Sequence, residues 1–284
     1  MKKVSVLLMV TGVIGILAST GISQAALTDG MIALYHFDGN MNDSAPGSSQ
    51  TGTLSGWAEV NQDDVQVGTG SFESQNGAES KNGNWSFGTV PEGGSIDGSN
   101  NWSITFWVKA KATQLWRNAW AFDEPNDTAD DADGIRLENG SGGGNDWRFY
   151  ASGYNGIASH SFQKINEKWT FFALTADGST LKVYQGFDDG NLSLAYSETI
   201  DTGEALKAGG SNGIMILGGR IANPSNAGRL LNCYLDELGI WNRGLSETEV
   251  QEIFDAGKAG TNIPEPATIG MMMSGIAGLI CKKK

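Results

Sequence analysis

Hydrophobic and polar positions alternate over several short stretches of this chain. Apolar side chains occupy every second position from Trp102 to Val108, and shorter apolar runs cover 31–37, 214–217 and 231–241. Alternate residues of a strand point to opposite faces, so these stretches predict β-strands. The 40 glycines, with many Asn, Asp and Ser residues, separate the runs, which is typical of an antiparallel all-β domain.

One predicted strand is apolar on both faces. Trp169, Phe171 and Ala173 alternate with Phe172 and Leu174. This pattern predicts a central strand with one face in the core and the other lining a concave surface. The Asp-Gly pair at 177–178, between this run and the next, predicts a hairpin turn.

A short helix is predicted near the C-terminal end of the domain. Ser246 with Glu249 three residues later forms a capping box, and Leu245 and Val250 are spaced as a hydrophobic staple around it. Gly257 is the predicted helix end.

The N-terminal segment has the pattern of a signal peptide. Two lysines precede an apolar run of about 15 residues from Val4 to Ala18, and small residues stand at Ser23 and Ala25. The run is short for a membrane span, which needs about 20 residues. We therefore predict a signal peptide at 1–25, cleaved after Ala25. The alternative is an uncleaved membrane anchor.

The C-terminal segment, 261–284, has three parts. Pro264, Glu265 and Pro266 precede the apolar stretch 267–280, and after Cys281 the chain continues with three lysines. About 15 apolar residues would cover about 22 Å of the roughly 30 Å hydrocarbon layer, which suits a transient anchor better than a lasting one. The lysines favour the cytoplasmic side. The alternative is an ordinary tail anchor.

These three parts, in this order, resemble a PEP-CTERM sorting signal of Gram-negative bacteria. The resemblance implies an exosortase-type processing enzyme as a partner and export to the outer surface or extracellular matrix. It also implies transient membrane association through both termini.

Charge restricts the partners of the remaining domain, which we place at 26–260. Without the two end segments the chain keeps 14 basic and 31 acidic residues, a net charge of about −17. This argues against nucleic acid and anionic lipid as ligands and permits divalent cations and neutral sugars. The alternative is that the acidity only maintains solubility. Cys233 is the single cysteine of this part, so no disulfide forms within it, and we expect a small buried apolar residue there.

Several blocks resemble the LamG-like jelly roll of the concanavalin A-like lectin/glucanase superfamily. They are LYHFDGNMNDSAPGSSQTGTLSG at 34–56, WSITFWVKA at 102–110, KWTFFALTADGSTLKVYQG at 168–186 and YLDELGIWNRGLSETEVQEIF at 234–254. The family often continues its Gly-x-x-Phe strand with Asp-Gly, whereas Phe72 is followed by Glu73 and Ser74 here. The resemblance implies two antiparallel sheets packed face to face, followed by the short helix.

The sequence offers little for catalysis. Retaining glucanases of this superfamily carry Glu-x-Asp-x-x-Glu on one strand, with two carboxyl groups about 5 Å apart, and that spacing is absent. Asp236 and Glu237 are adjacent and should face opposite sides, and His36 and His160 are expected to be structural. We therefore expect a module that is not an enzyme. The alternative is a glycoside hydrolase or polysaccharide lyase whose carboxylates converge from distant strands.

The resemblance implies a structural calcium ion near the opening loop and the final strand, where Asp38, Asp43 and Asp236 match. Calcium takes six to eight oxygen ligands, so three carboxylates are a partial set. The alternative is that Asp38 and Asp43 make Asx turns. The acidic loop 123–134 departs from the EF-hand pattern and is interpreted as a solvated loop rather than a second cation site.

Aromatic residues concentrate in one region of the sequence beside this loop: Trp116, Trp120, Trp147, Tyr150 and Tyr154. Aromatic rings stack on sugar faces, so we interpret the group as a ligand surface for extracellular polysaccharide or a surface glycan. The alternative is core packing. The resulting hypothesis is an exported, non-catalytic module for carbohydrate or matrix binding. A purely structural matrix protein is the remaining alternative.

Overall fold

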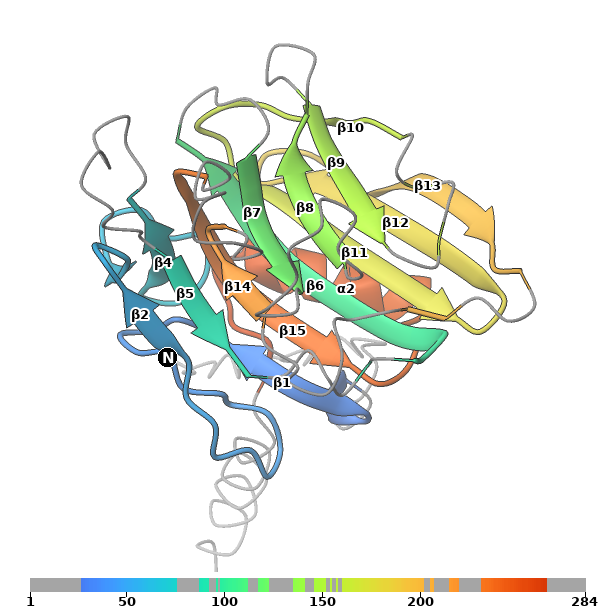
Figure 1. Ribbon diagram of the computed structural model, residues 1–284, viewed down its shortest axis with the longest axis horizontal. Coiled ribbons are helices and arrows are strands. Elements are labelled where there is room, and N and C mark those ends of the chain that lie inside the picture. The colour runs from blue at the N-terminus through green and yellow to red at the C-terminus, as the bar shows by residue number, and fades with distance from the viewer. Residues whose placement is uncertain are drawn as a thin grey trace, which may run out of the picture.

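The computed structural model describes residues 27–75, 87–91, 96, 98–111, 117–122, 135–140, 146–151, 154, 157, 160–201, 205–206, 215–219 and 231–264. The predicted signal peptide therefore lies outside the described residues, as do the acidic loop 123–134 and the tail beyond Pro264. The described chain forms two antiparallel sheets packed face to face (Figure 1).

One sheet has eight strands within the described residues. Its order is β13 (Ser193–Thr199), β12 (Thr180–Phe187), β11 (Thr170–Asp177), β6 (Asn101–Ala110), β15 (Cys233–Trp241), β4 (Ser71–Ser74) and β3 (Glu59–Asn61). The eighth strand, β1 (Met31–Tyr35), pairs with the second half of β15, while β4 pairs with its first half.

The other sheet has seven strands in the described part of the chain. Its order is β10 (Phe162–Gln163), β9 (Asp146–Ala151), β8 (Ile135–Asn139), β7 (Arg117–Phe122), β14 (Met215–Leu217), β5 (Phe87–Val90) and β2 (Thr53–Ser55). In both sheets, strands distant in sequence are neighbours, as β6 between β11 and β15 illustrates. The predicted jelly-roll sandwich is confirmed.

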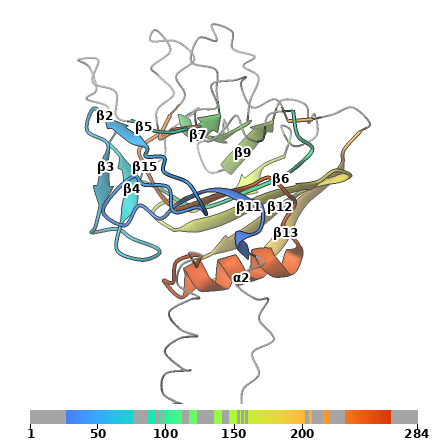
Figure 2. The same cartoon turned by 90° about the horizontal axis from the view of Figure 1, so that it is seen from below.

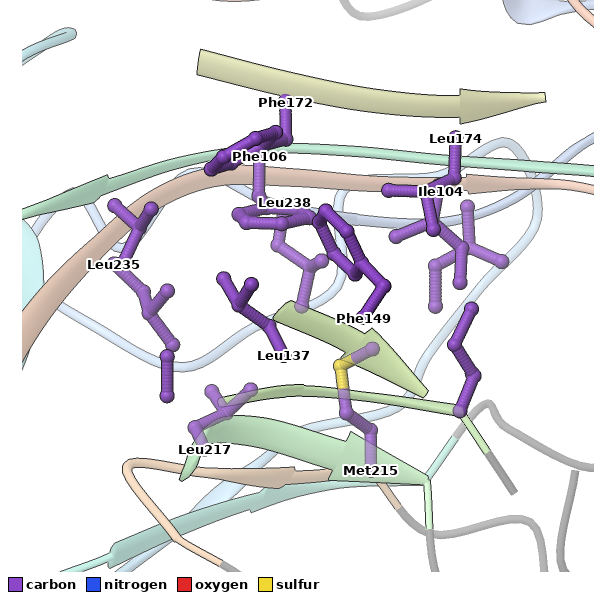
Figure 3. Close-up of a cluster of buried hydrophobic side chains, with 14 of the residues drawn as sticks. Ile104, Phe106, Leu137, Phe149, Phe172, Leu174, Met215, Leu217, Leu235 and Leu238 are labelled. Carbon is purple, nitrogen blue, oxygen red and sulfur yellow. The ribbon is translucent and has the colours of Figure 1, made fainter. Parts of the chain in front are cut away.

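The main core fills the space between the two sheets (Figure 3). Ile104 and Phe106 of β6 point from the eight-stranded sheet toward Leu137 and Phe149 of the seven-stranded sheet, and all four are fully buried. Phe149 contacts the ring of Phe172 edge to face, with the ring centroids 5.1 Å apart. The alternation seen in the sequence therefore places one face of each strand in this core. Cys233 is buried in the same cluster, as expected.

Helix α2 (Glu247–Lys258) covers the other face of the eight-stranded sheet (Figure 2). Phe254 stacks on Trp107 of β6 with centroids 5.6 Å apart, and Phe171 of β11 packs against the same ring. This corrects the expectation for β11: its second apolar face lies under a helix and lines no concave surface. We call this second apolar cluster the α2 layer.

The start of α2 is as predicted and its end is not. Ser246 is the N-cap, its hydroxyl accepts from the amide of Glu249, and the Glu249 carboxylate accepts from the amide of Ser246 at 2.8 Å. The helix continues past Gly257 to Lys258. Gly257 packs closely against β6, because a Cβ there would lie 2.3 Å from Nε1 of Trp107. Gly260, with φ +73°, follows the helix end. Within the described residues, no helix is long and apolar enough to cross a bilayer.

Candidate functional site

Two of the five predicted ligand aromatics lie in the core. Trp147 and Tyr154 are 1% and 2% exposed, and Trp102 donates from its Nε1 to the Tyr154 hydroxyl at 3.2 Å. For these two residues the core-packing alternative applies. Trp116 lies outside the described residues. The backbone of Trp120 pairs with Leu137 and Leu217 in β7, but its side chain is not among those described.

Tyr150 differs from Trp147 and Tyr154 because it points outward. Along β9, Trp147, Phe149 and Ala151 are buried, whereas Asp146, Arg148 and Tyr150 are partly exposed. Successive strand residues face opposite sides. The second set therefore projects from the outer face of the seven-stranded sheet, away from the core.

The neighbouring strand β8 places polar side chains opposite these residues. Arg136 is opposite Tyr150, and Glu138 is opposite Arg148. The guanidinium of Arg136 lies 4.4 Å from the Tyr150 ring centroid, a cation–π distance. We call Arg136, Glu138, Asp146, Arg148 and Tyr150 the β8–β9 polar face.

Mutual contacts hold the β8–β9 polar face in place. Nε of Arg148 donates to Oδ2 of Asp146 at 3.1 Å, and the Ser161 hydroxyl donates to the same oxygen at 2.8 Å. Nε of Arg136 lies 3.6 Å from Oε2 of Glu138. A side chain at Gly140, opposite Asp146 beyond the end of β8, would place its Cβ 2.3 Å from Oδ1 of Asp146, so glycine makes room for that carboxylate.

Two groups of this face have raised pKa values. Burial and the Glu138 carboxylate raise the pKa of Tyr150, so the phenol stays neutral. The Asp146 carboxylate raises the pKa of Arg148. The Arg148 side chain is 27% exposed and that of Glu138 is 2% exposed. Arg148 is therefore accessible to a ligand, whereas Glu138 is buried and contacts Arg136 and Tyr150.

This arrangement offers several hydrogen-bonding groups to a ligand. It offers guanidinium donors, carboxylate acceptors and a phenol in fixed positions, which suits a polyhydroxylated ligand. Glu138 and Asp146 each have a guanidinium partner.

The three predicted calcium ligands each bind backbone amides. Oδ1 of Asp43 accepts from the amides of Leu34 and Ala45, the second being an Asx turn, and Oδ2 is buried without a hydrogen-bond partner among the described residues. Asp38 accepts from Thr69 and from Asn262. Burial alone would raise the pKa of Asp38, but these hydrogen bonds bring it below its ordinary value.

Asp236 is fully buried, and its side chain bridges two segments. Oδ2 accepts from the amides of Gln66 and Val67 at 3.0 and 2.9 Å, and Oδ1 accepts from the amide of Glu237. Burial and the adjacent Glu237 raise the pKa of Asp236 well above its usual range. In the described part of the chain, no three His, Cys, Asp or Glu side chains gather in a group that could hold a metal ion. The structure therefore does not bring Asp38, Asp43 and Asp236 together in one such group, and calcium binding stays a prediction.

Glu237 and His36 form a pair that the sequence did not reveal. Glu237 has a left-handed backbone with φ +48°, next to a bulge in β15, so its side chain is buried like that of Asp236. Oε1 of Glu237 lies 2.5 Å from Nδ1 of His36, and Oε2 accepts from the amide of Ile263 at 2.9 Å. His36 is therefore buried with a carboxylate partner.

Comparison with known proteins identifies the family of this fold. Residues 82–251 match the Laminin_G_3 family, described as the concanavalin A-like lectin/glucanases superfamily. No curated protein sequence matches the chain. Among solved structures, domain 4 of AbnA, a GH43 extracellular arabinanase from Geobacillus stearothermophilus in complex with arabinotriose, is 19% identical with a TM-score of 0.50. That alignment covers 78% of this chain and 97% of the domain.

Two botulinum neurotoxin structures are also similar. One, of type C, whose cell entry depends on interaction with two ganglioside molecules, is 13% identical with a TM-score of 0.57 and covers 83% of this chain. The other, the neurotoxin DC binding domain in complex with rat synaptotagmin II, is 13% identical with a TM-score of 0.54 and covers 81%. This chain spans about half of each neurotoxin chain, 53% and 52%. At these identities the likeness concerns the fold.

Proposed function

Because the chain belongs to the concanavalin A-like lectin/glucanases superfamily, we propose that it is a non-catalytic glycan-binding module whose ligand contacts the β8–β9 polar face. The observation that carries the proposal is the outward row Asp146, Arg148 and Tyr150 beside Arg136 and Glu138. Two proteins of similar fold support a sugar as the ligand class: the arabinanase domain in complex with arabinotriose, and the type C neurotoxin, whose cell entry depends on gangliosides.

Recognition at this face rests on hydrogen bonds more than on ring stacking. Arg136 covers the Tyr150 ring, and the Tyr150 hydroxyl interacts with Glu138 and Arg148. A sugar would therefore meet a phenol hydroxyl and the donors of Arg148 rather than a bare aromatic platform. Hydrogen bonds to charged groups contribute about 1.5–3 kcal/mol each, so few contacts are needed for specific binding.

The test is retention of the purified protein on immobilised polysaccharides, with arabinan and ganglioside-bearing vesicles in the panel. Wild-type protein should bind at least one member saturably, and Arg148→Ala should weaken that binding. Lys182→Ala is the matched control, because it removes one positive charge from β12 in the other sheet. Equal binding by the wild type and Arg148→Ala would reject this site. No saturable binding across the panel would favour a purely structural matrix protein.

We also propose that the module is exported and acts at the surface of a Gram-negative-type bacterium, after processing by an exosortase-type enzyme. The sequence patterns at 1–25 and 261–284 support this. Mass spectrometry of the native protein should find a mature form that begins at Ala26 and lacks the terminal lysines. A mature form that retains Lys284 would indicate a tail-anchored protein.

The proposed lack of catalytic activity and the predicted binding of calcium have separate tests. Incubation with the same polysaccharides should release no reducing ends or unsaturated products; release of either would favour the hydrolase or lyase alternative. Calcium binding stays a prediction. Calorimetric titration with calcium chloride checks it. The prediction would be wrong if the titration gave no heat of binding and calcium did not raise the melting temperature.

A further inference from the structure

Both ends of the described domain dock on the α2 layer. Leu27 and Ile263 are 6% and 2% exposed, and both belong to the apolar cluster that α2 covers. Figure 2 shows this helix as a separate layer on the side of the eight-stranded sheet away from the seven-stranded sheet. The chain therefore enters and leaves the domain on the same side.

The N-terminal end is held by the end of β15. Nε1 of Trp241 donates to the carbonyl of Leu27 at 2.7 Å, and the amide of Asn242 donates to the carbonyl of Gly30 at 2.8 Å. These contacts begin two residues after the predicted cleavage position at Ala25.

The C-terminal end is held by a segment that we call the strap, residues 260–263. The amide of Gly68 donates to the carbonyl of Gly260 at 3.3 Å, and Nδ2 of Asn262 donates to Asp38 at 2.7 Å. The amide of Ile263 donates to Glu237, the partner of His36. The strap is therefore fixed up to the residue before Pro264.

Chain length then limits how far the domain can stand from the apolar tail. The apolar stretch begins at residue 267, four residues after Ile263. An extended chain spans at most about 3.5 Å per residue, so four residues reach about 14 Å. This is comparable to the diameter of one helix with its side chains, about 10–12 Å.

We propose that, while the tail occupies the bilayer, the α2 layer faces the membrane and the β8–β9 polar face points away from it. The proposal rests on the tail being membrane-inserted, and it deepens the proposed function because it directs the glycan site outward. Stacked sheets lie about 10 Å apart and the helix adds a layer of about 10 Å, so the outer face of the seven-stranded sheet is about 20 Å farther from the lipid than the α2 layer.

The charge of α2 adds no attraction to anionic lipid, so the orientation depends on the tail. Its polar side carries Glu247, Glu252 and Asp255 against Lys258. An acidic surface gains nothing from anionic lipid. Cleavage after Pro264 leaves the strap contacts intact and should release a folded domain from the membrane.

Site-specific quenching tests the orientation with the chain from Ala26 to Lys284, which lacks the predicted signal peptide, purified with its tail and reconstituted in vesicles that contain nitroxide-labelled lipid. Cys281→Ser removes the tail thiol, and Cys233 is fully buried. A fluorophore is then placed at Thr248→Cys, on the exposed side of α2, or at Thr53→Cys, exposed on β2 of the seven-stranded sheet. A chain that ends at Ile263 is the control.

The label at residue 248 should be quenched at least about twofold more than the label at residue 53, given the extra 20 Å. The chain that ends at Ile263 should show no quenching at either position. Equal quenching at both positions, or stronger quenching at residue 53, would overturn the orientation. A chain from Ala26 to Lys284 that does not associate with the vesicles would overturn its premise about the tail, and polysaccharide retention would still judge the glycan site separately.

Discussion

Trp147 and Tyr150 lie on the same strand but on opposite faces, so replacing each in turn separates packing from binding. The indole of Trp147 is 1% exposed, so Trp147→Ala empties a site in the core. An aromatic side chain buries about 150–250 Å², which at about 25 cal/mol per Å² corresponds to about 4–6 kcal/mol. Measured Trp→Ala changes in cores cost about 3–5 kcal/mol.

Two local contacts adjust this estimate. The Lys164 ammonium lies 5.3 Å from the Trp147 ring centroid and loses that contact in the variant. Nε1 of Trp147 is buried without a hydrogen-bond partner among the described residues, so removing it relieves a cost of about 1–3 kcal/mol. We therefore expect Trp147→Ala to lower the free energy of unfolding by about 3 kcal/mol, toward the low end of the range.

Equilibrium urea unfolding measures this loss, and retention of the folded fraction on the bound polysaccharide measures binding. Trp147→Ala should be unstable but should bind normally per folded molecule. Tyr150→Ala should be within about 1 kcal/mol of wild-type stability, as expected for a half-buried residue, and should bind weakly. Wild-type stability together with lost binding in Trp147→Ala would refute the reasoning, because it would make the indole a ligand contact.

Three further predictions concern stability. Burial alone would raise the pKa of Glu249, but its hydrogen bonds with Arg243 and Ser246 outweigh burial and bring the pKa below its ordinary value of 4.5. This carboxylate therefore stabilises the fold above pH 4.5 and loses that effect as the pH falls through the lowered pKa. Glu249→Gln should cost about 1–3 kcal/mol in urea unfolding at pH 7 and almost nothing at pH 2; an equal cost at both would contradict it. Burial lowers the pKa of Lys164 from 10.5 to about 8, so the unfolded chain binds more protons between these values and stability should rise from pH 8 to pH 10. Lys164→Met should flatten this rise. An unchanged slope of the free energy of unfolding against pH in the variant would contradict the role given to Lys164. Gly257→Ala should lower the melting temperature because its Cβ would clash with Trp107 at 2.3 Å, whereas Gly190→Ala, with its nearest contact at 3.6 Å, should not; equal melting temperatures for both variants would contradict the packing.

The sequence predicted the fold because its strands follow a period of two over long stretches. The alternation in β6 and the capping box at Ser246 both appear in the structure. The run in β11 was identified as a strand apolar on both faces, but what covers the second face depends on α2, about 70 residues later. Local pattern alone carries no information about that partner.

The candidate site was only partly predictable. Proximity in sequence grouped the aromatic residues, although the alternation in DWRFYA places Trp147 and Tyr150 on opposite faces and was itself a usable signal. Arg148 was missed because charged residues on a strand are usually solvated. The pairing of Glu237 with His36 could not be derived, because it depends on a bulge and a left-handed residue that break the period of two.

The affinity of Arg148→Ala for the polysaccharide that retains the wild-type protein tests the proposed site most directly. Calorimetric titration of both proteins, each confirmed to be folded, provides the comparison. Loss of a hydrogen bond to a charged group costs about 1.5–3 kcal/mol, so the dissociation constant should rise about 10- to 150-fold. An unchanged dissociation constant would contradict binding at the β8–β9 polar face.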